Sequence, residues 1–241
     1  MNQYPEQSPS QYCVAGVLTC YCGPSAEESI LYYINPVSAD GEHLVSSTGD
    51  WTVGQYGLAG GWGNVVHNSP YSWKYLETNS AHGTVPGGET PWWSGGTDYP
   101  MSGTINWWVS RNYSGSPYYV ENPLPGTGKG GTLTLTTYEA DLTSDIWNQG
   151  AGGWPLAADV WEFPGKTPYL NGHNTNLEVQ HFITLYGYGS SGATTAYIDP
   201  IYGSALNGHS GFNLTSSHYT GYPSSSIVSL VNYGATFGIV W

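Results

Sequence analysis

A change in the character of the sequence near residue 150 most constrains what this chain can fold into. Beyond it, residues 155–162, 179–187, 194–199 and 235–241 are rich in β-branched and aromatic side chains, which is typical of strands. A short Gly-Ser-Ser-Gly segment separates the second of these from the third. We therefore predict an antiparallel sheet in the second half of the chain.

The first half carries helix signals instead. Residues 1–21 are rich in Gln, Pro and Ser and predict an irregular arm. A helix is expected from Cys22, because Pro24 suits a first helical turn and the apolar residues Ile30, Leu31 and Ile34 follow with helical spacing.

Further helices are expected around residues 52–58, 101–112 and 138–148, and a long Gly/Pro/Trp loop over 78–100. Helices in front of a sheet predict an α+β fold. We expect one domain over 1–241, with a mainly helical half at 22–150, a mainly β half at 151–241 and a cleft between them.

The charge balance excludes whole classes of partner. Four Lys and Arg residues stand against 17 acidic residues, for a net charge of −13. Such a surface cannot neutralise phosphates or anionic lipid, so we expect neither nucleic-acid nor membrane binding. No apolar run approaches the roughly 18 residues that a membrane-spanning helix needs.

The same composition favours an extracellular location. Only 9% of the residues are charged, so uncharged polar side chains and an acidic net charge must keep the protein in solution. The N-terminal residues lack the basic end and apolar middle of a signal peptide. We therefore expect a secreted protein whose sequence begins after a cleavage site.

Three cysteines, Cys13, Cys20 and Cys22, lie close together near the N-terminus. An odd number of cysteines in an exported protein leaves one thiol unpaired. Cys13 and Cys20 can close a short loop, whereas a bridge between Cys20 and Cys22 would be strained. We therefore predict a Cys13–Cys20 disulfide and a free thiol at Cys22.

Three residues together suit nucleophilic catalysis. A helix N-terminus favours a thiolate, and its N–H groups can stabilise an oxyanion, so Cys22 is the expected nucleophile. His181 opens a predicted strand and is the best-placed base. Asp199 ends the next strand, where it can reach and orient His181.

Three longer motifs surround these residues. They are Tyr21-Cys22-Gly23-Pro24-Ser25-Ala26, His181-Phe182-Ile183-Thr184-Leu185-Tyr186-Gly187-Tyr188 and Tyr197-Ile198-Asp199-Pro200. Together they resemble the motifs of the bacteriocin-processing peptidases and their secreted relatives, a branch of the papain-like cysteine peptidases. The resemblance implies a papain-like fold and cleavage of peptide or protein substrates by Cys22, His181 and Asp199.

The chain departs from the family pattern at the oxyanion hole. Family members place a Gln five or six residues before the catalytic Cys, and this chain has Gly16 and Val17 there. Gln11 is the expected substitute, ahead of Gln7 and Gln3. The membrane and ATPase domains of the exporter-fused members are not in this sequence, so the resemblance does not supply the natural substrate.

Each of these residues also has a structural explanation. Cys22 can be a buried or bridged cysteine, His181 a core histidine, Asp199 a turn former before Pro200 and Gln11 a surface residue. Two other functions remain open: an acyltransferase or deamidase with the same triad, or a non-catalytic glycan- or peptide-binding module. We expect no metal or cofactor, because the other histidines lack metal-ligand spacing: His43, His67, His82, His173, His209 and His218.

Overall fold

The structure, a computed structural model, forms two compact units, Met1–Glu121 and Asn122–Trp241. The predicted arm at 1–21, the predicted helices at 52–58 and 101–112 and the predicted loop at 78–100 all lie outside the described residues. These are 22, 25–26, 29–30, 33, 119, 121–122, 132–147, 153–202, 207–208, 211–233 and 238–241.

In the first unit, the helix expected from Cys22 is present. Its described residues are all helical, from Cys22 through Tyr33. Ser25, Ala26, Ser29 and Ile30 are buried, while Tyr33 is 40% exposed, so one face of the helix is covered. The hydroxyl of Ser29 donates to the carbonyl oxygen of Ser25, 3.0 Å away, one turn earlier.

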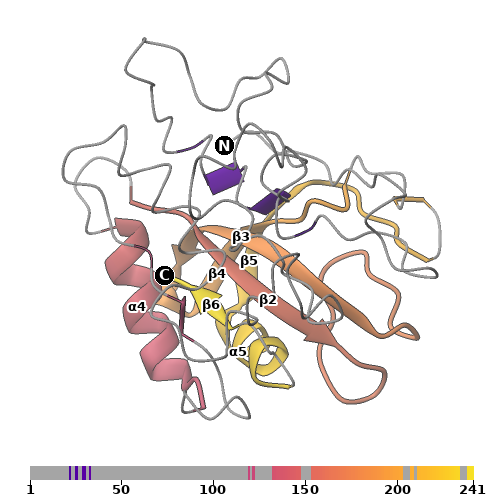
Figure 1. The fold of residues 1–241 in the computed structure, drawn as a ribbon, viewed down its shortest axis with the longest axis horizontal. Helices are drawn as coiled ribbons and strands as arrows, with labels where there is room; N and C mark the ends of the chain where they lie inside the picture. The colour runs from indigo at the N-terminus through magenta and orange to yellow at the C-terminus, as the bar shows by residue number, and fades with distance from the viewer. Residues whose placement is uncertain are drawn as a thin grey trace, which may run out of the picture. The chain divides into compact units, whose positions relative to one another are not determined.

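The second unit contains most of a six-stranded sheet in the order β1-β6-β2-β3-β4-β5 (Figure 1). Strands β2, β4 and β6 fall within three of the predicted strand segments, and β3 begins where predicted and ends two residues later. Their pairings are antiparallel, as expected. Strand β5 was not predicted. The bounds are β1 Glu121–Asn122, β2 Leu156–Glu162, β3 Val179–Gly189, β4 Thr194–Ile198, β5 His218–Pro223 and β6 Ile239–Val240.

Two helices, α4 (Leu135–Trp147) and α5 (Ser224–Asn232), pack against this sheet and against each other. Helix α4 confirms the helix predicted at 138–148 and begins slightly earlier. Helix α5 was not predicted, because its three leading serines and its Ile and Val residues favour other conformations in isolation. The described residues therefore confirm a mixed α+β fold.

The connection between β3 and β4 is tight. It is a single 3-10 segment, η5 (Ser190–Gly192), at the Gly-Ser-Ser-Gly segment identified in the sequence. Ser190, Ser191 and Gly192 all have positive φ angles, of 51°, 55° and 96°. This turn brings the end of β4 back beside the start of β3, which is the topology on which the predicted His181–Asp199 pair depends.

A hydrophobic core fills the space between the sheet and the two helices. Residues at alternate positions of β2 and β3 point into it, since side chains alternate between the two faces of a strand. From β2 these are Leu156, Ala158 and Val160, and from β3 they are Ile183 and Leu185, all almost fully buried. The same alternation places the side chains of Glu162 and His181 on this face of the sheet.

Candidate active site

Ionisable side chains replace apolar ones at one end of the core face. Glu162 follows Val160 on β2 at the next inward position, and His181 precedes Ile183 on β3 in the same way. The register pairs Val160 with His181 and Glu162 with Val179, so Glu162 and His181 are diagonal neighbours on one face. Asp199 comes directly after β4.

His181 and Asp199 are in contact at this end of the sheet. The Nε2 atom of His181 lies 3.1 Å from Oδ1 of Asp199, and the two side chains are 2% and 0% exposed. This geometry confirms the expectation that the short β3–β4 connection brings the two residues together. Because Asp199 engages Nε2, acid or base chemistry by His181 on a substrate would use Nδ1.

Asp199 also stabilises the turn that follows it. Its Oδ1 accepts a hydrogen bond from the backbone N–H of Ile201, 2.9 Å away, as is common for Asp in turns. Its own backbone N–H donates to the carbonyl oxygen of Ser217 at 2.9 Å. Asp199 therefore both forms the turn, as its structural explanation predicted, and contacts His181.

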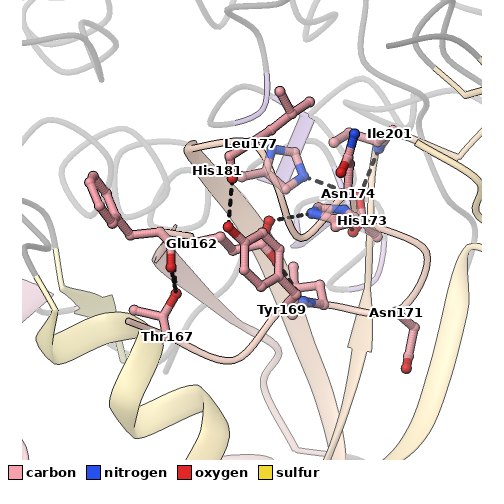
Figure 2. A network of polar contacts seen from close by, with 12 residues as sticks. Glu162, Thr167, Tyr169, Asn171, His173, Asn174, Leu177, His181 and Ile201 are labelled. Atoms are coloured by element: carbon pink, nitrogen blue, oxygen red, sulfur yellow. Dashed lines mark hydrogen bonds and ion pairs between the residues drawn. The ribbon is translucent and has the colours of Figure 1, made fainter. Parts of the chain in front are cut away.

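A second histidine, His173, holds the other oxygen of the same carboxylate. Its Nε2 lies 2.9 Å from Oδ2 of Asp199, and its Nδ1 lies 2.6 Å from Oε2 of Glu162. Figure 2 shows the rings of His173 and His181 side by side, and their centroids are 5.9 Å apart. The edge-on ring of Phe212, 5.0 Å away, covers His173.

The outer end of this chain of contacts is also fixed. Oε1 of Glu162 accepts a short hydrogen bond from the backbone N–H of Leu170, at 2.5 Å. Both carboxylate oxygens of Glu162 are therefore engaged, although its side chain is completely buried. Four ionisable side chains thus form one buried network that runs from Glu162 through His173 and Asp199 to His181.

The charges in this network follow from its geometry. Burial opposes the charged form of His173, but the carboxylates of Asp199 and Glu162 outweigh it and raise the pKa of His173 to about 9. Burial alone would raise the pKa of Asp199, yet His173 and His181 lower it well below its usual value. Near neutral pH, Asp199 is a carboxylate and His173 an imidazolium.

The proposed nucleophile belongs to the other unit. Cys22 is helical, half-buried and a free thiol, as predicted. The residue before it lies outside the described ranges, and so do Gln11, the candidate oxyanion donor, and the predicted Cys13–Cys20 disulfide. The structure thus brings together two of the predicted site residues, His181 and Asp199, and describes the third by itself.

Glu162 and His173 were not predicted to belong to the site. His173 is one of the scattered histidines without metal-ligand spacing, and nothing in its local sequence distinguishes it. Glu162 carries a weak signal, because it occupies an inward position of β2 after three apolar residues. A carboxylate at such a position needs a buried partner, and a search for that partner could have led to His173.

No group of three or more His, Cys, Asp or Glu side chains in the described part of the chain is arranged to hold a metal ion. No helix within the described ranges has the length and apolar character needed to cross a bilayer.

Comparison with known proteins gives no relative for this chain. No protein-family model matches it, and neither a curated protein nor a solved structure shows significant similarity to it. Its function is therefore inferred from the residues of the site themselves.

Proposed function

We propose that this chain is a secreted, papain-like cysteine peptidase that cleaves peptide bonds through Cys22, His181 and Asp199. One observation carries the proposal: His181 and Asp199 form a buried imidazole–carboxylate pair, 3.1 Å apart, at adjoining strand ends. Such a pair orients the ring and stabilises the imidazolium that forms when the ring accepts a proton. Cys22, a partly exposed free thiol in a helix, supplies the nucleophile.

The chemistry that we propose proceeds in two steps. Nδ1 of His181 takes the thiol proton of Cys22, and the thiolate attacks the carbonyl carbon of a peptide bond. His181 then protonates the leaving amine, and a thioester to Cys22 remains. A water molecule, deprotonated by His181, hydrolyses the thioester and restores the thiol.

Other parts of the proposal concern the surroundings of the triad. We assign the oxyanion hole to the backbone N–H of Cys22 and to Gln11, because N–H donors at these places can stabilise the negative oxygen. The substrate is a peptide or protein, and no metal or cofactor takes part in the steps above. An acidic surface with few Lys and Arg residues supports an extracellular setting.

The decisive experiment combines thiol labelling with a cleavage assay. The unreduced protein is treated with iodoacetamide and mapped by peptide mass, and casein cleavage is measured for wild type and Cys22→Ala. We expect a single alkylation, at Cys22, and no cleavage by the variant. Ser29→Ala is the matched control, because Ser29 lies on the same helix but carries no role in the chemistry.

The alternatives give different results in the same samples. Release of ammonia from protein-bound Gln, without chain cleavage, would assign the triad to a deamidase or acyltransferase. A bridged or unreactive Cys22 together with no cleavage would reject catalysis and leave a binding module. Cleavage that persists in Cys22→Ala would show that another residue is the nucleophile.

A further inference from the structure

We propose that His173 is a positioning residue of this site: held between Glu162 and Asp199, it sets the rotation of the Asp199 carboxylate so that Oδ1 faces His181. This inference rests on the proposed function, because it adds two residues to the same site. Neither Glu162 nor His173 touches the substrate in this scheme; both act through Asp199.

The contacts of Asp199 show why its orientation depends on His173. Oδ1 meets Nε2 of His181 at 3.1 Å and the N–H of Ile201 at 2.9 Å. Oδ2 meets Nε2 of His173 at 2.9 Å. A carboxylate can rotate about its Cβ–Cγ bond, and donors on both oxygens fix that rotation. Loss of His173 would remove the contact that it makes with Oδ2, and with it one of the constraints on this rotation.

Glu162 stabilises the charged form of His173, which has a carboxylate at each ring nitrogen. A neutral imidazole carries one N–H, so only the imidazolium can donate to Glu162 and Asp199 at the same time. Buried charges are stable only when they are paired. Glu162 is thus the second counter-ion of His173, so Asp199 does not compensate the charge of His173 alone and can also pair with His181.

The charge of His173 also acts on His181 directly. The two rings are 5.9 Å apart, so a cation at His173 disfavours a second proton at His181, while Asp199 favours it. Three phenols also lie near this network, and burial first, then the neighbouring carboxylates, raises their pKa values, so they are neutral near pH 7. Tyr169 and Tyr222 interact with the charge of Glu162, and Tyr197 interacts with that of Asp199. Glu178, which also acts on Tyr169, and His218, whose backbone pairs with Ile198, are further ionisable residues beside the network in the described part of the chain.

The first test reads the protonation states by NMR of the full chain with ¹⁵N-labelled histidine. In the wild type, we expect both ring nitrogens of His173 to carry protons at neutral pH. Glu162→Gln keeps the shape of the side chain and removes its charge. In that variant the pKa of His173 should fall, because one of its two carboxylate partners no longer carries a charge. At pH values where His173 has become neutral, His181 should hold its proton more strongly than in the wild type.

The second test uses casein cleavage by the same proteins. Glu162→Gln should lower kcat about tenfold or more with little change in KM, and should move the alkaline limb of the pH profile upward. Glu178→Gln is the matched control, because Glu178 is exposed and its Oε1 accepts a hydrogen bond from Nε1 of Trp161, at 2.9 Å, away from the His173–Asp199 contact. We expect it to match the wild type in both tests.

Two results would overturn the inference: a wild-type His173 that is neutral at pH 7, or a His181 titration that Glu162→Gln leaves in place. The wild-type spectrum decides alone if the variant does not fold. If the NMR results are as expected but cleavage does not require Cys22, the peptidase function fails while the positioning of Asp199 by His173 stands.

Discussion

Raising the pH should destabilise the folded protein mainly through His173. The pKa of this residue is about 9 in the folded state, against 6.5 for an ordinary histidine. A group whose pKa is higher in the folded state stabilises the fold below its unfolded pKa, and this contribution disappears as the pH rises through the folded value. At about 1.4 kcal/mol per pKa unit, the loss between pH 6.5 and pH 9 and above amounts to about 3 kcal/mol.

Urea unfolding at a series of pH values between about 6 and 9 measures this loss. At higher pH the buried tyrosines, whose pKa values are raised by burial, would add a pH dependence of their own. Cys22→Ala serves as the background, because it removes both thiol ionisation and self-cleavage. In this background the unfolding free energy should fall by about 3 kcal/mol across the series. Adding His173→Gln should lower the stability at pH 6 and remove most of the pH dependence, since Gln does not titrate.

The pH dependence of the Cys22→Ala protein with and without His173→Gln tests whether His173 is a buried imidazolium. Equal slopes of unfolding free energy against pH, with and without His173, would refute the assignment of a buried imidazolium to this position. A rise in stability with pH in the Cys22→Ala protein would refute it as well, because the sign follows directly from the two carboxylates that hold the ring.

Three further predictions concern the site and the fold. Asp199→Asn should lower kcat/KM for casein on the order of 100-fold, because an amide does not stabilise the imidazolium as a carboxylate does; an unchanged value would remove Asp199 from the triad. Gly192→Ala should lower the unfolding free energy in urea by about 2 kcal/mol, because Gly192 has φ +96° and a backbone oxygen of α4 would lie 3.1 Å from the new Cβ. Gly165→Ala should cost less, because Gly165 has φ +68° but open space around the new Cβ. Leu185→Ala should lower the unfolding free energy by about 2–5 kcal/mol, because it leaves a cavity in the core, while Leu135→Ala, at a position 38% exposed, should change it little. Equal losses of unfolding free energy in the two variants would place Leu185 outside the core.

Much of the second unit could be predicted from short-range patterns. Runs of β-branched and aromatic residues predicted strands β2, β3 and β4, and the Gly-Ser-Ser-Gly segment predicted the turn that η5 forms. The His181–Asp199 contact followed from that topology, because a tight turn between antiparallel strands brings their outer ends together. Helix α5 could not be predicted in this way, because its Ile and Val residues become helical only by packing on β2 and α4.

The sequence by itself determined strands β2, β3 and β4, the turn between β3 and β4 and the identity of Cys22, His181 and Asp199 as candidates. Each of these depends on neighbours a few positions away. Only the tertiary structure decided that Glu162 and His173 join them. His173 is 11 residues from Glu162 and 26 from Asp199 along the chain, and no local pattern encodes such distances. Glu162, His173 and Asp199 come into contact because β2 and β3 lie side by side and the loop between them, which carries His173, folds back over the end of the core. Charged side chains buried there are stable only when they are paired.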